Sequence, residues 1–130
     1  MSTLELNGRI FDASTTGTLT LTGEGSATTD VTQGLCKHWI DYNGDMALQD
    51  SFNTASLTDN AAGQGTPTFV NNMSNIIYCM SNNSQASGTN TGKSIASGNA
   101  TTSTYKQETY ESDSATDPFS ANCAVHGDLA

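Results

Sequence analysis

The stretch LCKHWIDYNGDMALQDSFNTASLTDN (residues 35–60) decides the fold, because it contains the only tryptophan together with a dense mix of aromatic and turn-forming residues. Residues 35–42 are predicted as a strand, in which successive side chains point to opposite faces. One face carries Cys36, His38, Ile40 and Tyr42, and the other carries Lys37, Trp39 and Asp41. The centre of the chain is therefore expected to be β-structure.

A turn follows this strand at Asn43-Gly44-Asp45. Asn and Gly adopt positive φ at low cost, so these residues predict a short hairpin into a second strand over residues 46–52. A third short strand is expected over residues 57–60 and a turn over residues 61–65, with the next strand starting at Phe69 and Val70.

The sequence before the central stretch also has strand character. Residues 4–11 contain alternating leucines and an Asn7-Gly8 pair, which predicts either a tight hairpin or one strand with a bulge at Gly8. Residues 15–25 place Leu19 and Leu21 in alternation with threonines, which predicts a half-buried strand bounded by glycines.

After the central stretch, residues 76–80 (IIYCM) are the most apolar run and are predicted as a fully buried strand. Residues 81–104 carry one large apolar residue, Ile95, so we expect a long exposed loop with, at most, a weak strand near residues 93–96. Such loops often carry binding residues, although a plain connector is the alternative. The candidate binding residues are Asn82, Asn83, Thr89, Asn90 and Lys93.

A final strand is expected over residues 119–125, and no segment has the spacing of an amphipathic helix. The predicted fold class is therefore all-β, an antiparallel β-sandwich of jelly-roll type. The expected core residues are Trp39, Ile40, Tyr42, Phe52, Ile77, Tyr78, Phe119, Cys123 and Val125. For Trp39, a subunit interface and sugar stacking in an exposed groove are the alternatives to core packing.

Polar residues dominate the composition: Ser, Thr, Asn and Gly supply 59 of the 130 residues, whereas Leu, Ile, Val and Phe supply 20. This ratio predicts a thin core, so we expect the chain to complete its burial against copies of itself or against a neighbouring subunit. The net charge is −9, and the only bases are Arg9, Lys37, Lys93 and Lys106. Nucleic-acid binding is not expected, because no basic patch can neutralise phosphates.

The start of the sequence has neither the basic segment nor the apolar segment of a secretory signal peptide. No apolar run approaches the roughly 20 residues that cross a bilayer, so membrane insertion is not expected. We therefore expect the chain to stay in the compartment where it is made or to leave it by lysis.

Candidate reactive side chains are sparse. Zinc binding by Cys36, His38, Cys79, Cys123 and His126 is not expected, because their spacing matches no zinc motif. Three widely spaced cysteines predict no disulfide framework, and we interpret them as small buried hydrophobes. The acids Asp41, Asp45 and Asp50 lack the EF-hand spacing and are interpreted as solvated turn residues. No catalytic, metal-binding or cofactor-binding residue is predicted, and a small hydrolase is the alternative.

Four segments of the central region resemble, in the same order, a domain of virion structural proteins from marine and cyanobacterial tailed phages, usually of tail-fibre type. These segments are Gln33-Gly34-Leu35-Cys36-Lys37-His38-Trp39-Ile40-Asp41-Tyr42-Asn43-Gly44, Asp50-Ser51-Phe52-Asn53, Ser56-Leu57-Thr58-Asp59-Asn60 and Met73-Ser74-Asn75-Ile76-Ile77-Tyr78. The resemblance covers about residues 29–80, and Cys36 and His38 depart from it, since the family usually has small residues there.

The resemblance implies a non-enzymatic virion protein, and the length of 130 residues predicts a single domain over residues 1–130. Residues 29–130 would form a fibre-type β-sandwich, and residues 1–28 would be N-terminal strands or a virion-anchoring arm. Such a tail fibre or adhesin is made in the host cytoplasm and displayed on the virion. Its expected partners are itself, as a homotrimer, other virion proteins, and a host surface glycan or protein. The alternatives are a capsid-decorating or head-fibre protein with the same domain, and a free carbohydrate-binding module.

Overall fold

The computed structural model describes residues 3–6, 9–12, 20–22, 28–85, 94–111 and 114–130, which divide between two compact units, Met1–Leu35 and Cys36–Ala130. The first unit is a four-stranded antiparallel sheet followed by a single helical turn. Its elements are β1 (Thr3–Leu6), β2 (Arg9–Asp12), β3 (Thr20–Thr22), β4 (Thr28–Asp30) and α1 (Val31–Gly34). Strands β1 and β2 pair antiparallel, which agrees with the predicted hairpin and not with one bulged strand, while Asn7 and Gly8 lie outside the described residues.

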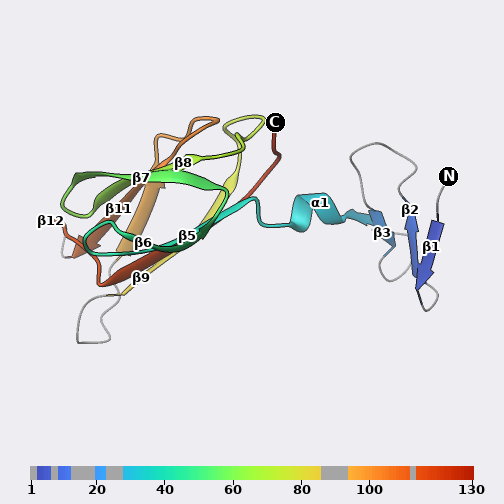
Figure 1. Cartoon of the computed structure of the whole chain (residues 1–130), viewed down its shortest axis with the longest axis horizontal. Coiled ribbons are helices and arrows are strands. Elements are labelled where there is room, and N and C mark those ends of the chain that lie inside the picture. Colours follow the sequence, from blue (N-terminus) through green and yellow to red (C-terminus); the bar gives the residue numbers. More distant parts are fainter. Residues whose placement is uncertain (1–2, 7–8, 13–19, 23–27, 86–93, 112–113) are drawn as a thin grey trace. The chain divides into compact units, whose positions relative to one another are not determined.

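The second unit contains two antiparallel sheets (Figure 1). One sheet has the order β6 (Leu48–Phe52), β5 (His38–Asn43), β13 (Ser120–His126) and β9 (Cys79–Gln85). The other has the order β10 (Ser94–Gly98), β11 (Lys106–Glu111), β8 (Gln64–Phe69) and β7 (Thr54–Ala61), with β12 (Ser114–Ala115) paired to β11. This arrangement confirms the predicted all-β sandwich.

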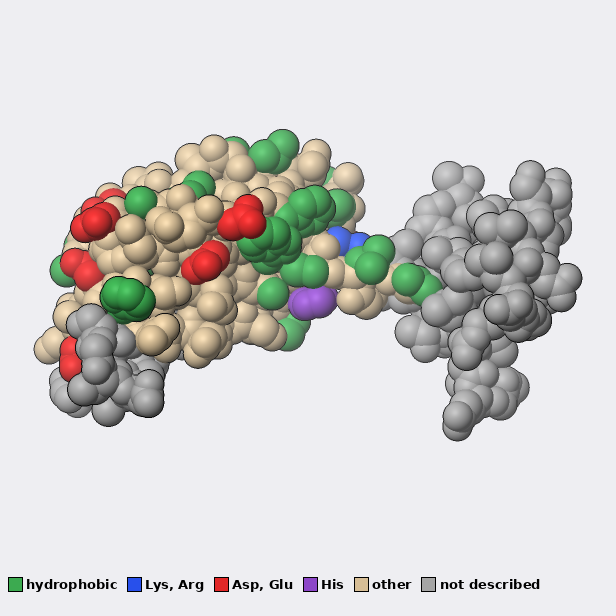
Figure 2. Space-filling model, turned by 60° about the horizontal axis from the view of Figure 1, so that its bottom comes forward, with side chains coloured by type: hydrophobic (Ala, Val, Ile, Leu, Met, Phe, Trp, Pro, Cys, Tyr) green, Lys and Arg blue, Asp and Glu red, His purple; other side chains and the backbone are tan. Residues whose placement is uncertain are grey.

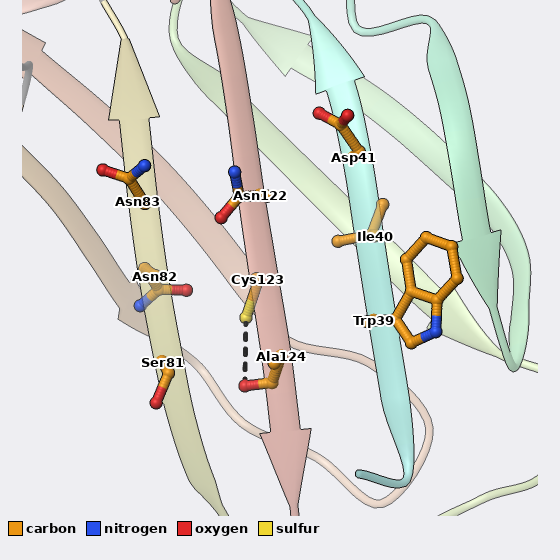
Figure 3. A pocket seen from close by; sticks show the side chains of 9 residues that line it. All are labelled: Trp39, Ile40, Asp41, Ser81, Asn82, Asn83, Asn122, Cys123 and Ala124. Atoms are coloured by element: carbon orange, nitrogen blue, oxygen red, sulfur yellow. Dashed lines mark hydrogen bonds between the residues drawn. The ribbon is translucent and has the colours of Figure 1, made fainter.

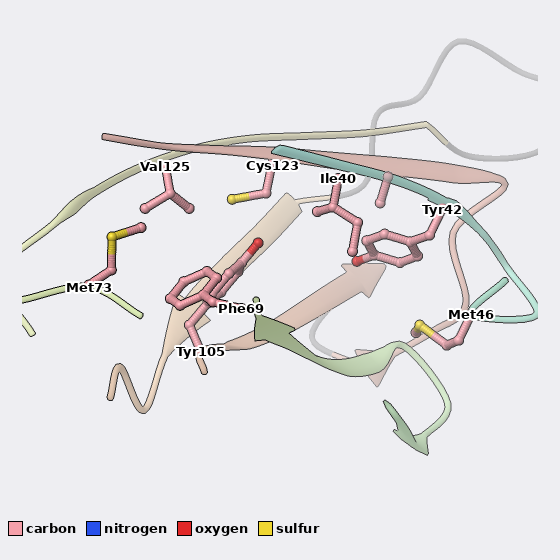
Figure 4. Packing of buried hydrophobic residues seen from close by; sticks show 9 residues of the cluster. Ile40, Tyr42, Met46, Phe69, Met73, Tyr105, Cys123 and Val125 are labelled. Carbon is pink, nitrogen blue, oxygen red and sulfur yellow. The ribbon is translucent and has the colours of Figure 1, made fainter. Parts of the chain in front are cut away.

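The core lies between these two sheets and follows the alternation of the sequence (Figure 4). In β5 and β13, every second side chain is buried, as in any strand with one covered face. The buried hydrophobic residues are Ile40, Tyr42, Met46, Phe69, Met73, Tyr105, Ala121, Cys123 and Val125, with Leu57, Tyr78 and Met80 packed against them. The predictions of Ile40, Tyr42, Cys123 and Val125 as core residues are thus confirmed, and Tyr78 lies at the margin.

The prediction of a core position is wrong for four other residues, which the single chain leaves exposed: Trp39, Phe52, Ile77 and Phe119. Trp39 alternates with His38 and Ile40, which are buried, so its side chain points away from the other sheet. Phe119 precedes the first residue of β13 and does not share the buried face of Ala121. Strand parity thus explains the exposure of Trp39 and Phe52, whereas Phe119 and Ile77 are exposed because they lie just outside β13 and β9.

Two predictions for the segments around β9 are also wrong. The apolar run at residues 76–80 is not a buried strand, since β9 starts only at Cys79 and Ile77 is 86% exposed. The expected loop over residues 81–104 is wrong for residues 81–85, which continue β9, whereas the weak strand expected near residues 93–96 is present as β10. Pairing with β13 explains this difference, because a partner strand can hold a polar segment extended that has little strand propensity of its own.

A single residue, Asn53, joins β6 of one sheet to β7 of the other. It adopts a left-handed conformation with φ of 58°, which Asn tolerates better than most residues. Its side-chain amide donates to the carbonyl oxygens of Lys37, at 2.9 Å, and Asn71, at 3.0 Å, and its Oδ1 accepts from the Asn71 N–H at 2.7 Å. Asn53 therefore fixes the corner at which the chain changes sheets.

Replacing Asn53 with Ala should lower the free energy of unfolding by about 3 kcal/mol, because three hydrogen bonds are lost and Ala is strained at positive φ. Asn53→Gly should cost less, since Gly keeps the conformation without strain. Chemical denaturation measures both effects. Asn60→Ala is the matched control, because the Asn60 amide makes one exposed hydrogen bond, to Thr66. Equal losses for Asn53→Ala and Asn60→Ala would contradict the role of the corner.

Candidate functional site

The outer face of the β6-β5-β13-β9 sheet carries two rows of side chains that cross all four strands. Strand register places Ser81, Ala124, Trp39 and Phe52 in one row, and Asn83, Asn122, Asp41 and Asp50 in the next. We call these eight residues the Trp39 face. In the view of Figure 2, hydrophobic and acidic side chains lie next to one another on the surface of the second unit.

The Trp39 face is hollowed at its centre. A cavity of about 360 Å³, which we call the Trp39 hollow, lies over β13. The residues that line it include Trp39, Asp41, Ser81, Asn83, Asn122 and Ala124. Figure 3 shows Trp39 of β5 and Asn83 of β9 on either side of Asn122 and Ala124 of β13. The hollow lies beside the Trp39 indole because the next two positions of this row, Ala124 on β13 and Ser81 on β9, are small residues.

The described residues of the Trp39 hollow supply acidic and amide side chains but no basic side chain. Asp41 accepts a hydrogen bond from the Ser120 hydroxyl at 3.3 Å, and its neighbour Asp50 accepts one from the Ser51 N–H at 2.8 Å. Among the described residues that line the hollow, none is Lys or Arg. Planar amides and carboxylates beside an indole ring are suited to binding a polar ligand, with the aromatic ring supplying the apolar contact.

The candidate binding residues from the sequence have different positions. Asn82 and Asn83 lie on β9, so their placement in a loop is wrong. Asn82 points inward and accepts from the Gln107 amide at 3.1 Å, whereas Asn83 points outward. Thr89, Asn90 and Lys93 lie outside the described residues. Asn122 was missed by the sequence analysis, although its alternation with the buried Ala121 and Cys123 placed it on the outer face.

The cysteines differ in exposure. Cys123 is buried as expected, Cys36 is half-buried and Cys79 is exposed, so the interpretation as buried hydrophobes is wrong for Cys79. The thiol of Cys36 donates to the backbone oxygen of His38 at 3.0 Å. In the part of the chain that the structure describes, no three His, Cys, Asp or Glu side chains are grouped closely enough to hold a metal ion.

His38 lies inside the sandwich. Its Nε2 is 3.0 Å from the Thr54 hydroxyl, and its ring packs edge-on against Phe69 and Tyr105 with centroids 4.9 and 5.6 Å apart. Burial disfavours the charged imidazolium and lowers the pKa of His38 from 6.5 to about 4. His38 is therefore a neutral packing residue at neutral pH.

His38 should make the stability of the sandwich depend on pH. Because its pKa is lower in the folded chain than in the unfolded chain, the unfolded state takes up the proton first as pH falls. The stabilisation is complete above about pH 6.5 and falls by up to about 3 kcal/mol as pH decreases to about 4. Chemical denaturation across this range should show the loss.

His38→Gln should be less stable at neutral pH but should lose this part of the pH dependence. His126→Gln is the matched control, because His126 is the other histidine of the chain and lies at the end of β13 outside the core. If the free energy of unfolding of His38→Gln fell between pH 6.5 and about 4 as steeply as that of the wild type, His38 would not be the source of the pH dependence.

Comparison with known proteins finds no matching family model, no matching curated protein and no matching solved structure. Within the described ranges, no helix has the length and apolar character needed to cross a membrane. The Trp39 hollow, together with the exposed apolar side chains of the second unit, is the feature of the described residues that is best suited to contacting another molecule.

Proposed function

We propose that this chain is a non-enzymatic structural protein of a tailed-phage virion, displayed on the particle surface as a tail fibre or adhesin. The four ordered segments over residues 29–80 that resemble such proteins support this function. The β-sandwich that these segments help to form is a compact unit suited to display. The four N-terminal strands pair in a sheet of their own, which favours the interpretation of residues 1–28 as an arm.

The observation that carries the proposal is a group of four exposed apolar side chains, Val70, Ile76, Ile77 and Leu129, on the two segments that the Met73–Leu129 bridge pairs, and we refer to this group as the patch. A bridge between Met73 and Leu129 holds the two segments of the patch together. The Ser74 N–H also donates to the Asp128 carbonyl at 2.8 Å. Exposed apolar groups of this kind usually lie in interfaces, so the patch supports assembly with further copies, as a homotrimer, or with other virion proteins.

Purified particles of the phage that encodes this chain test the proposal directly. We expect mass spectrometry to detect the chain in the particles, and a single-particle map to contain its sandwich. Density at the tail or baseplate would support a fibre or adhesin, and density at capsid symmetry axes would support the alternative of a decorating or head-fibre protein. Absence of the chain from intact particles would refute a virion role.

Ile77→Ser should break the assembly without unfolding the sandwich. Light scattering should give the wild-type chain a mass three times its 13.6 kDa, and the variant the mass of one chain. Because Ile77 is exposed in the single chain, the free energy of unfolding of the variant should differ from that of the wild type by no more than about 0.5 kcal/mol. Phe119→Ser, at another exposed apolar residue, should keep the wild-type mass. A wild-type monomer would contradict self-assembly.

A free carbohydrate-binding module is the second candidate, and the Trp39 hollow favours it. An exposed indole beside amide side chains suits sugar recognition whether or not the chain belongs to a particle. A folded monomer that binds glycans and is absent from virions would support the module.

A further inference from the structure

We infer that the Trp39 hollow binds an uncharged oligosaccharide. The inference rests on the host-contact role proposed above and names the ligand class and the site for that role. It combines three features of the described residues: an exposed aromatic ring, two amide groups without hydrogen-bond partners, and the sign of the local charge.

Trp39 supplies the exposed aromatic ring. Trp39 is 37% exposed, and its cross-strand neighbour Ala124 leaves the space beside the indole open. An indole accepts the apolar face of a sugar ring, because the C–H groups of the sugar carry partial positive charge and the face of the indole is negative. Phe52, directly opposite Trp39 on β6, is also exposed and extends the apolar surface. Two aromatic residues in one row suit a ligand longer than a single sugar.

A row of two amides and one carboxylate supplies the hydrogen bonds. Asn83, Asn122 and Asp41 are cross-strand neighbours on three adjacent strands, so the row spans about 10 Å at the usual strand spacing. Among the described residues, the side chains of Asn83 and Asn122 have no hydrogen-bond partner, so they present donors and acceptors to a ligand. Sugar hydroxyls donate and accept in the same way. The cavity of about 360 Å³ lies within the range of small-molecule sites.

Charge decides between ligand classes. Asp41 and Asp50 lie on the Trp39 face, the described residues that line the hollow include no Lys or Arg, and the whole chain has a net charge of −9. Phosphorylated, sulfated and uronic saccharides would be repelled. A second copy of the chain fits the face less well, because it would bring two further aspartates close to Asp41 and Asp50. An uncharged saccharide carries no negative charge that Asp41 and Asp50 would repel.

The test uses the full-length chain and the fluorescence of Trp39, which is the only tryptophan and therefore reports on the hollow alone. The probes are neutral oligosaccharides of glucose, mannose, galactose and N-acetylglucosamine, with oligogalacturonate as the acidic counterpart. We expect a saturable change with at least one neutral probe and none with the acidic probe. Asn83→Ala and Asn122→Ala should each weaken binding about tenfold, as expected for the loss of hydrogen bonds to the ligand.

Calorimetry extends the test to variants of Trp39. Trp39→Ala should abolish binding and Trp39→Phe should retain part of it, while Phe119→Ala should bind as the wild type does. If Trp39→Ala does not fold, the asparagine variants and Trp39→Phe decide the outcome. No binding of any neutral probe, or equal binding of the acidic one, would overturn the inference. A fall in assembly mass on Trp39→Phe or Asn122→Ala would also overturn it, because a second copy would then cover the face.

The inference and the proposed function can fail separately. Particles that contain the chain, combined with a chain that binds no neutral probe, would refute the saccharide site and keep the virion role. Saccharide binding by a chain that is absent from particles would refute the virion role and keep the site.

Discussion

The packing of the His38 ring against Phe69 and Tyr105 is the contact on which the sandwich depends. His38 begins β5 in one sheet, whereas Phe69 ends β8 and Tyr105 precedes β11 in the other. Each such aromatic contact is worth about 0.5–1.5 kcal/mol beyond the area it buries. A chain with so few aliphatic residues thus joins its two sheets with rings and methionines, and the Trp39 face remains available on the outer side.

Local alternation was enough to predict the strands that carry most of the core. It placed Ile40 and Tyr42 on one face of β5, and Cys123 and Val125 on one face of β13. The errors at Trp39, Phe52 and Ile77 arose where residue type was given more weight than alternation, whereas Phe119 follows the alternation but precedes the first residue of β13. Trp39 and Phe52 were assigned to the core as large aromatics, yet Trp39 already stood on the face opposite Ile40 in the sequence pattern. Ile77 was assigned to a strand because its neighbours are apolar, although no partner strand holds that segment.

The binding face could be predicted only in part, because it depends on strand register. Asn83 belongs to a run of Ser and Asn that resembles a turn, and only its pairing with Asn122 on β13 makes it part of a strand. Trp39, Asn83 and Asn122 are far apart in the sequence, so their common hollow has no local signature. The hollow forms only where β5, β13 and β9 pair, so the sequence of no single strand indicates it.

The position of β13 has a consequence for how the chain folds. This strand comes last among the described elements, yet it lies between β5 and β9 in the middle of its sheet, with Val125 opposite His38. Until residues 120–126 have been synthesised, β5 and β9 each have an unpaired edge. Pairing β5 with β13 requires the long segment between them to close, and this costs conformational entropy before the pairing stabilises the sheet. Folding should therefore be slow, and incomplete chains should be prone to aggregate through the unpaired edges of β5 and β9.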